Sequence, residues 1–268
     1  MKQLSGRTAI VTGASPNIGG MLAQGLAAAG ARVVCTDVLQ DVADRCADRI
    51  TAAGGEALAI SGDVTDPDHA DAAVALALDR WGGVPDILVN NAVWFNQKGL
   101  LTMPLVEYRR QLDIILGGAF IFTKSVATAM IAAKRPGSII NVLSTAAWQG
   151  QPGNIGYSTG KSGLINFTRS AAMELAEHRI RVNGFTPTAT MPEDPELLRK
   201  LAESGLPASD YPMDFAGQFP WHRLPTPSDY VPTVVFLASD DAAMITGSNI
   251  TVDGGAMAKY WPWQPHSS

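Results

Sequence analysis

The sequence predicts an α/β fold: one doubly wound parallel sheet of about seven strands, covered by helices on both faces. The 268-residue chain is 46% hydrophobic and 17% charged, which is enough apolar material for one large core. Over the first 185 residues, short β-branched runs alternate with longer segments at helical spacing, which is typical of repeated strand–helix–strand units. Most of these runs are apolar throughout, as strands between two layers of helices must be.

The predicted strands are seven short segments. They lie at residues 8–12, 32–37, 57–61, 86–90, 138–144 and 181–185, and in the sequence SNITVDGG near the end. A helix follows the first strand, because Ile18, Leu22 and Leu26 recur on one helical face. Gly30 suits the position just after that helix.

Four more helices are predicted along the chain. One begins at Asp66–Pro67, with aspartate as N-cap and proline at the first position, and the others cover residues 105–133, 155–178 and 228–238. Gly117–Gly118 lies inside the first of the long helices, at a cost of about 1 kcal/mol per glycine relative to alanine. We therefore expect a closely packed neighbour against these glycines.

Residues 1–268 are predicted to form a single domain. Its amino-acid composition changes after residue 186, since nine of the 17 prolines lie from Pro187 to Pro232. We interpret residues 191–226 as a proline-rich substrate lid, because the helix and strand that follow return the chain to the same sheet. Residues 258–268 form a tail with three aromatic side chains, which we expect to pack on a neighbouring subunit.

Composition excludes several classes of function. The net charge is −5, so a nucleic-acid partner is not expected. Cys35 and Cys46 cannot build a disulfide framework, and no uninterrupted apolar run reaches the roughly 18 residues of a membrane span. The four histidines lack ligand-like spacing, so no metal site is expected. We expect a soluble cytoplasmic protein without a membrane contact.

A glycine-rich turn, TGASPNIGG at residues 12–20, joins the first strand to its helix. Glycines there let the backbone approach a pyrophosphate, which the helix N-terminus also attracts. Asp37 ends the second strand, 18 residues beyond Gly19, close to the spacing of about 20 expected for a carboxylate that binds an adenosine ribose. The alternatives are an ordinary turn and a solvated strand end.

A second group of residues suits acid–base chemistry. Tyr157 and Lys161 are four residues apart and share one helix face, and Ser144 is the last residue of a predicted strand. A nearby ammonium favours the phenolate and can bring the tyrosine pKa from about 10 into a working range. Ser144 could hold the reacting oxygen. The alternative is an ordinary surface pair on an amphipathic helix.

Together these segments resemble the short-chain dehydrogenase/reductase family over residues 5–257. The motifs that carry the resemblance are TGASPNIG at 12–19, DV at 63–64, NNA at 90–92, NVLS at 141–144, YSTGK at 157–161, RVN at 181–183 with Pro187, ITG at 245–247 and DGG at 253–255. The resemblance implies a Rossmann-like fold and a homotetramer, in which the 105–133 and 155–178 helices pair between subunits.

The resemblance also implies the site residues. Ser144, Tyr157 and Lys161 would be catalytic. The cofactor would be NAD, bound by Gly13, Asn17, Ile18, Gly19, Asp37, Asp63, Val64, Asn90, Ala92, Tyr157, Lys161, Pro187, Thr188 and Thr190.

The sequence departs from the family pattern at several positions. Asn17 replaces a glycine of the phosphate turn, and we expect it to serve because asparagine tolerates a positive φ. Ile115 stands where the family has a fourth catalytic residue, an asparagine that helps to hold a proton-relay water near Lys161. The relay is therefore expected to differ here, whereas hydride transfer is not.

The favoured function is an NAD-dependent oxidoreductase that acts on an uncharged secondary alcohol, ring-containing and aromatic or sugar-like. Asp37 would repel the 2′-phosphate of NADP. The predicted substrate pocket comprises Trp94, Gln97, Trp148, Gln149, Asn154 and Phe185, with lid aromatics at Tyr211, Phe215, Phe219 and Trp221. Two alternatives remain open: a dinucleotide-binding regulator without turnover, and an epimerase or dehydratase that retains NAD.

Overall fold

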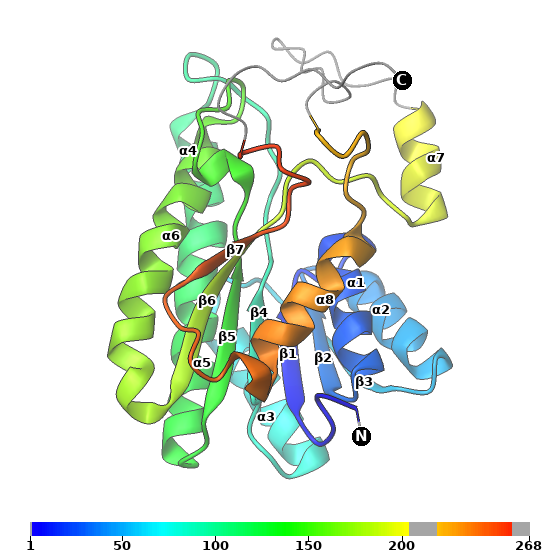
Figure 1. Ribbon diagram of the computed structural model, residues 1–268, viewed down its shortest axis with the longest axis vertical. Coiled ribbons are helices and arrows are strands. Elements are labelled where there is room, and N and C mark those ends of the chain that lie inside the picture. The colour runs from blue at the N-terminus through cyan, green and yellow to red at the C-terminus, as the bar shows by residue number, and fades with distance from the viewer. Residues whose placement is uncertain (1, 204–218, 259–268) are drawn as a thin grey trace.

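One sheet of seven parallel strands organises the chain in a computed structural model, which describes residues 2–203 and 219–258 (Figure 1). In spatial order the strands are β3 (Glu56–Ser61), β2 (Arg32–Asp37), β1 (Thr8–Thr12), β4 (Ile87–Asn90), β5 (Gly137–Val142), β6 (Ile180–Thr186) and β7 (Asn249–Thr251). The chain runs outward from β1 to β3, crosses back to β4, and then runs outward to β7. The strand order therefore reverses between β1 and β4, where sheets of this kind bind ligands.

Helices cover both faces of this sheet (Figure 1). They are α1 (Ile18–Ala28), α2 (Gln40–Ala52), α3 (Pro67–Trp81), α4 (Leu105–Leu112), α5 (Gly118–Ala132), α6 (Ile155–Leu175), α7 (Pro195–Glu203) and α8 (Pro227–Ala238). One apolar core joins the sheet to α1, α2 and α8, and a second joins it to α3, α5 and α6. The doubly wound prediction is confirmed.

The first six predicted strands begin and end within two residues of the observed ones. Asp66 caps α3 as predicted, since its side chain accepts a hydrogen bond from the Asp68 amide, and Pro67 begins that helix. Helices α2 and α7 were not among the predicted elements. In α2 the buried face consists of Ala43, Cys46, Ala47 and Ile50, which is a short and weakly apolar stripe.

The predicted helix at 105–133 is continuous, but its middle is a π-helical turn, Asp113–Gly117, between α4 and α5. Gly118 packs directly on Val64, because a Cβ on this glycine would lie 2.8 Å from Val64 Cγ2. Nothing lies within 4 Å of the equivalent point on Gly117. The expectation of a close neighbour therefore holds for Gly118 alone.

By length and composition the segment Leu105–Ala132 could cross a membrane. The segment is not one uninterrupted apolar run, because Lys124 lies within it. In the fold its α5 part contributes Phe122, Val126 and Met130 to the core beneath the sheet. Core helices of water-soluble proteins pass the same test of length and composition.

The predicted lid is described only in part. Helix α7 and residues 219–226 belong to it, and there Phe219 is buried whereas Trp221 is exposed. Tyr211, Phe215 and the tail from residue 259 onward lie outside the described residues. The lid and the packing of the tail stay predictions.

Candidate active site

Helix α6 and the end of β5 bring the three predicted catalytic side chains together. Tyr157 and Lys161 lie on one face of α6, with the lysine Nζ 5.8 Å from the centre of the tyrosine ring. Ser144 lies two residues beyond β5, and its Oγ accepts a hydrogen bond from the Ala146 amide at 3.1 Å; Ser144 and Tyr157 both line one cavity. The arrangement places two hydroxyl groups where a substrate oxygen can meet both.

Lys161 is buried below Tyr157 rather than exposed beside it. Its side chain is 3% exposed, and Nζ donates to the Val142 carbonyl oxygen at 2.5 Å. Burial lowers the pKa of Lys161 to about 7, because an ammonium loses its hydration in a low-dielectric interior. The alternative of a surface pair is therefore wrong.

Burial also raises the pKa of Tyr157, and the hydrogen bond with Ser144 opposes this only in part. The sequence-based expectation was a lowered tyrosine pKa. That expectation is wrong, because desolvation of the buried phenolate outweighs the hydrogen bond with Ser144 and raises the tyrosine pKa.

Ile115 lies in the π-helical turn and is buried in an apolar cluster that includes Leu143 and Leu164 and packs against Tyr157. A void of about 10 Å³ adjoins it, lined also by Asn90 and Lys161. Isoleucine offers no hydrogen bond there. The side chain at this position therefore gives Lys161 no polar partner.

Asn90 lies beneath the site rather than in its open part. Its Nδ2 donates to Thr123 Oγ1 at 3.1 Å and to Asn141 Oδ1 at 2.8 Å. Among the described residues its Oδ1 is buried without a hydrogen-bond partner. Asn90 therefore ties β4 to β5 and presents an unused acceptor close to the void beside Lys161.

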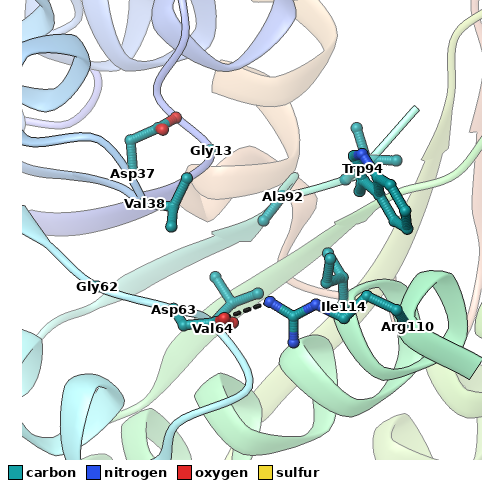
Figure 2. Close-up of a pocket in the computed structure, with 11 residues that line it drawn as sticks. Gly13, Asp37, Val38, Gly62, Asp63, Val64, Ala92, Trp94, Arg110 and Ile114 are labelled. Carbon is teal, nitrogen blue, oxygen red and sulfur yellow. Dashed lines mark hydrogen bonds and ion pairs between the residues drawn. The ribbon is translucent and has the colours of Figure 1, made fainter. Parts of the chain in front are cut away.

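A first cavity of about 420 Å³ lies at the carboxyl ends of β1 to β4, and we call it the Asp37 cavity (Figure 2). It is lined by Gly13, Asp37, Val38, Gly62, Asp63, Val64, Ala92, Val93, Trp94, Arg110 and Ile114. Burial raises the pKa of Asp37, whereas hydrogen bonds from the amides of Leu39 and Val38 oppose the shift. Five of the predicted cofactor residues, Gly13, Asp37, Asp63, Val64 and Ala92, share this cavity.

The glycine turn is held by residues that follow β4. Gly13 has a φ of +66°, and a Cβ on it would lie 2.8 Å from the Ala92 Cα. Thr12 Oγ1 accepts from the amides of Asn91 at 3.0 Å and Ala92 at 3.1 Å, and Asn91 Nδ2 donates to the Gly13 carbonyl at 2.8 Å. Asn91 was not among the predicted site residues, although the doubled asparagine was its signal.

Asn17 does not use the conformation expected of it. Its φ is −130°, so tolerance of a positive φ plays no part, and the expectation was wrong. Among the described residues its Oδ1 is buried and has no hydrogen-bond partner. A polar group thus stands unused at the N-terminus of α1, where backbone amides and the helix dipole favour an anion.

A second cavity of about 670 Å³ adjoins the first, since Val93 lines both, and we call it the Tyr157 cavity. No charged side chain occurs among its described lining residues. They are Ser15, Asn17, Ile18, Gly19, Asn91, Val93, Phe95, Gln97, Ser144, Thr145, Ala146, Gln149, Gly150, Gln151, Tyr157, Thr188, Ala189, Thr190 and Leu201. Side-chain amides and hydroxyls dominate its polar part.

The predicted substrate residues are distributed differently from the expectation. Gln97 and Gln149 line the Tyr157 cavity, and Trp94 lines the Asp37 cavity. Trp148 donates from Nε1 to Thr186 Oγ1 at 3.3 Å and lines neither cavity.

Phe185 and Asn154 are buried away from both cavities. Phe185 is fully buried against Tyr230, with ring centres 5.2 Å apart, because its position on β6 faces α8. Asn154 is 1% exposed and donates to Gln151 Oε1 at 3.1 Å. The assignment of Phe185 to the substrate pocket was therefore wrong, and so was that of Asn154 as an open hydrogen-bonding group.

The segment after β6 closes the second cavity. Thr188 and Thr190 line it, whereas Pro187 is buried and its carbonyl accepts from the Thr145 amide at 3.0 Å. Within residues 2–203 and 219–258, no group of three or more histidine, cysteine, aspartate or glutamate side chains could hold a metal ion.

Comparisons with known proteins agree with this geometry. The family model described as enoyl-(acyl carrier protein) reductase matches residues 13–257. A 3-oxoacyl-[acyl-carrier-protein] reductase of Synechocystis is 38% identical over 95% of this chain and 98% of its own length. A galactitol 2-dehydrogenase of Agrobacterium fabrum is 36% identical over 94% of this chain and 98% of its own.

Solved structures show the same architecture. A short-chain type dehydrogenase/reductase from Mycobacterium marinum superposes with a TM-score of 0.83 at 32% identity, covering 96% of this chain and 97% of that one. The likeness covers nearly the whole chain, so the sheet and the helices that flank it follow a known architecture.

Proposed function

The chain belongs to the short-chain dehydrogenase/reductase family of oxidoreductases, and we propose that it is an NAD-dependent dehydrogenase of an uncharged secondary alcohol. The observation that carries the proposal is the adjoining pair of cavities. One presents a carboxylate at the end of β2, and the other is uncharged in its described lining and has Ser144 and Tyr157 in its wall.

The residues present fit a dinucleotide. Both cavities flank the glycine turn. Gly13 lines the first cavity and has no side chain to cover its backbone, and the start of α1 lines the second cavity. Val38, Val64, Ala92 and Ile114 form apolar walls suited to a flat heterocycle, and Asp37 suits a ribose diol while repelling a 2′-phosphate. NAD would supply the hydride acceptor.

Tyr157 is the proposed general base in alcohol oxidation. Its phenolate oxygen would take the hydroxyl proton of the alcohol, and Ser144 would donate a hydrogen bond to the same substrate oxygen; bound NAD would supply the acceptor for the C–H hydride. Positioned acid–base groups of this kind contribute about 10² to 10⁴ in rate. Lys161, when protonated, favours the phenolate from below the ring.

The substrate class follows from the lining of the Tyr157 cavity. Gln97, Gln149 and Thr188 offer donors and acceptors without charge, which suits a compound with several hydroxyl groups. Relatives of 34–36% identity include a galactitol 2-dehydrogenase, an L-rhamnose 1-dehydrogenase (NAD(P)(+)) and a sorbitol dehydrogenase. A sugar alcohol or another ring-containing, uncharged secondary alcohol fits best.

A second candidate, reduction of a 3-oxoacyl thioester, is favoured by the 38% identical Synechocystis relative. A carrier-bound thioester brings a phosphate, which calls for an unpaired cation near the cavity. Two cations of the neighbouring loops are already paired with carboxylates, Lys98 with Glu107 and Arg223 with Asp229, each at 2.6 Å. This pairing ranks thioester reduction second.

One assay separates these functions. Purified protein is mixed with NAD or NADP and a panel of galactitol, sorbitol, L-rhamnose, cyclohexanols and aromatic alcohols, and with NADH or NADPH and acetoacetyl-coenzyme A. We expect NADH formation with a neutral polyol or cyclic alcohol. Faster turnover of the thioester would overturn the substrate class, and equal kcat/KM for NAD and NADP would overturn the cofactor choice.

Two other outcomes address the remaining alternatives. Dinucleotide binding without turnover of any compound would favour a regulator. Conversion of a substrate without net NADH would favour an epimerase or dehydratase that retains its cofactor. Chromatographic analysis of the products in the same reaction mixtures distinguishes the second case from simple inactivity.

We also propose a homotetramer in which the 105–133 and 155–178 helices pair between subunits. Phe120 on α5 is 54% exposed and Met173 on α6 is 67% exposed, so both helices carry apolar side chains that association would cover. Sedimentation equilibrium of the full chain should give four times the monomer mass. A monomer at micromolar concentration would refute this assembly. The expected location of the protein in the cytoplasm is a separate prediction.

A further inference from the structure

Phe95 is the only aromatic side chain besides Tyr157 among the described lining residues of the Tyr157 cavity. Its ring centre lies 5.0 Å from that of Tyr157, and the interplanar angle of 63° makes the contact edge-to-face. Phe95 is nevertheless 55% exposed. An aromatic surface is therefore open to a ligand beside the hydroxyl that the proposed chemistry uses.

The segment that follows β4 separates the two cavities. Val93 lines both of them, Trp94 lines the Asp37 cavity, and Phe95 lines the Tyr157 cavity. Residues 91–99 form neither helix nor strand, so no ladder of backbone hydrogen bonds holds this segment. The position of the Phe95 ring therefore depends on the side chains that fasten its neighbours.

Gln111 of α4 fastens the segment from within. It is 0% exposed, and its Nε2 donates to the carbonyl oxygens of Trp94 at 3.1 Å and Asn96 at 3.3 Å, one on each side of Phe95. Its Oε1 lies against the start of α6, because a Cβ on Gly156 would be 2.1 Å from it. One buried amide thus fixes the segment relative to the helix that carries the candidate base.

Glu107, also on α4, fastens the same segment a second time. Its carboxylate accepts from Asn96 Nδ2 at 2.5 Å and from Lys98 Nζ at 2.6 Å. Hydrogen bonds to a charged group are stronger than those between neutral groups. The Phe95 ring is therefore held in place from both sides of the chain, and it offers a ligand a fixed apolar wall.

We propose that Phe95 determines the substrate specificity of the Tyr157 cavity by packing against the ring of a cyclic secondary alcohol. This inference rests on the proposed function, since it requires an alcohol whose oxygen meets Ser144 and Tyr157. An oxygen held there places the attached carbon atoms beside the Phe95 ring. A cyclic compound presents a C–H face to that wall and loses less torsional freedom on binding than an open chain does.

The competing explanation is purely structural, in which Phe95 only supports the Tyr157 ring. Removal of Phe95 would then lower the turnover of cyclic and open-chain alcohols by the same factor. The ratio of kcat/KM between a cyclic alcohol and its open-chain counterpart distinguishes the two explanations, because a general loss of activity cancels in that ratio.

The test uses two pairs of neutral alcohols, cyclohexanol with 3-hexanol and myo-inositol with sorbitol. The members of each pair have the same number of carbon atoms and differ chiefly in ring closure. Values of kcat/KM with NAD are measured for the parent, Phe95→Ala, Phe95→Tyr and Leu101→Ala. Leu101 precedes α4, is 98% exposed and lines neither cavity, so it is a matched loss of an apolar side chain. Thermal unfolding of each variant reports any general loss of structure.

We expect the parent to prefer the cyclic member of the pair that it oxidises faster by about 10-fold. Phe95→Ala should reduce this preference to less than about 3-fold, mainly through a higher KM for the cyclic alcohol. Phe95→Tyr keeps the ring and should keep the preference, and so should Leu101→Ala.

Gln111→Leu tests the positioning role of the buried amide, because leucine retains most of the volume and cannot donate a hydrogen bond. It should lower the preference for the cyclic alcohol by about 3-fold in the parent, as for the loss of a hydrogen bond. In the Phe95→Ala background it should leave the ratio unchanged, since its effect passes through Phe95. An equal effect in both backgrounds would separate Gln111 from the Phe95 wall.

Other results would contradict the proposal in distinct ways. If Phe95→Ala slowed both members of a pair by the same factor, the aromatic contact would be structural only. If the parent oxidised open-chain and cyclic alcohols equally well, the cavity would not recognise a ring. If the parent oxidised no alcohol with NAD, the proposed function would fail, and the role of Phe95 would fail with it.

Discussion

The two adjoining cavities use charge in opposite ways. The Asp37 cavity has two carboxylates and a guanidinium in its wall, whereas the described lining of the Tyr157 cavity has amides and hydroxyls without a charge. The cation of the second region, Lys161, lies beneath the cavity, where burial lowers its pKa to about 7. Under the proposed function, charge would select the cofactor in the first region and would assist the proton acceptor Tyr157 in the second.

Fixed charges therefore suit the Asp37 cavity but not the Tyr157 cavity. Fixed charges near a cofactor discriminate well between ligands that differ by a phosphate, because a unit charge at short range is worth several kcal/mol at a partly buried site. A fixed charge in the substrate region would instead be costly unless a partner matched it. The uncharged lining of the Tyr157 cavity and the position of the Lys161 amine beneath it avoid the cost of an unmatched charge.

The largest expected effect concerns the hydroxyl group of Tyr157, which lines the Tyr157 cavity. Tyr157→Phe should lower kcat by about 10² to 10⁴, because the substrate proton loses its acceptor. Steady-state NADH formation measures the loss, and NAD affinity should stay near that of the parent. Tyr108→Phe, on α4 and outside both cavities, is the control. A Tyr157→Phe variant as active as the parent would remove the tyrosine from the mechanism.

A smaller effect is expected from the charge of the first cavity. Asp37→Ser should raise kcat/KM for NADP relative to NAD by about 10- to 100-fold, since removal of the carboxylate ends its repulsion of a 2′-phosphate. Asp41→Ser removes an equal charge from the neighbouring first turn of α2 and should leave the ratio unchanged. If both variants changed the ratio alike, overall charge rather than Asp37 would select the cofactor.

The buried Lys161 should make the stability of the folded protein depend on pH. The pKa of Lys161 is about 7 in the folded state against an ordinary value of 10.5, so the unfolded chain binds more protons between these values. Stability of the parent should therefore fall as the pH decreases from 10 toward 7. Lys161→Met removes this titration. The stability of this variant relative to the parent should therefore increase as the pH decreases from 10 toward 7.

Urea unfolding at pH 7, 8.5 and 10 measures this difference. The loss of the bond to the Val142 carbonyl is common to every pH, so the slope with pH is the informative quantity. Lys124→Met, an exposed lysine on α5, should show no such slope. A flat difference for Lys161→Met would mean that the folded protein keeps this lysine charged without penalty.

The smallest effect is expected at Ile115. Ile115→Asn should leave kcat unchanged or raise it by less than about 3-fold, while burial of an amide in an apolar cluster lowers stability by about 1 to 3 kcal/mol. The new amide can share a water with Lys161 and with Asn90 Oδ1, which has no hydrogen-bond partner among the residues that the structure describes. Leu116→Asn, the next residue of the π-helical turn, should lose stability without any gain in rate.

An Ile115→Asn protein that is folded but inactive would contradict this expectation. It would show that the apolar side chain has a role of its own beside Tyr157. Solvent isotope effects on kcat in the parent and in Ile115→Asn would then report whether proton transfer had become slower.

The strands and the helix that carries Tyr157 and Lys161 could be predicted from local properties. Alternating β-branched and helical segments depend on neighbours within a few residues, and so does the shared face of Tyr157 and Lys161. The glycine turn and Asp37 were placed by spacing and by family resemblance. Both lie at the carboxyl edge of the sheet, as strand order requires once the fold is parallel.

Other parts of the site depended on contacts between distant segments. Phe185 reads as a pocket residue because it ends a strand, yet the side of the sheet that it faces is decided by α8. Asn90 likewise turns toward β5 and α5 instead of the open cavity. A strand pattern gives alternation but does not say which neighbour covers which face.

The sequence by itself therefore determined the doubly wound class, the succession of the seven strands along the chain, and Ser144, Tyr157 and Lys161 as the candidate catalytic residues. Only the tertiary structure decided which charges meet. It paired Arg110 with Asp63, buried Lys161 deeply enough to lower its pKa, and raised that of Tyr157. The physical reason is that ion pairing and desolvation depend on the distances between atoms brought together from separate elements, whereas backbone propensity and helix periodicity act within a single one.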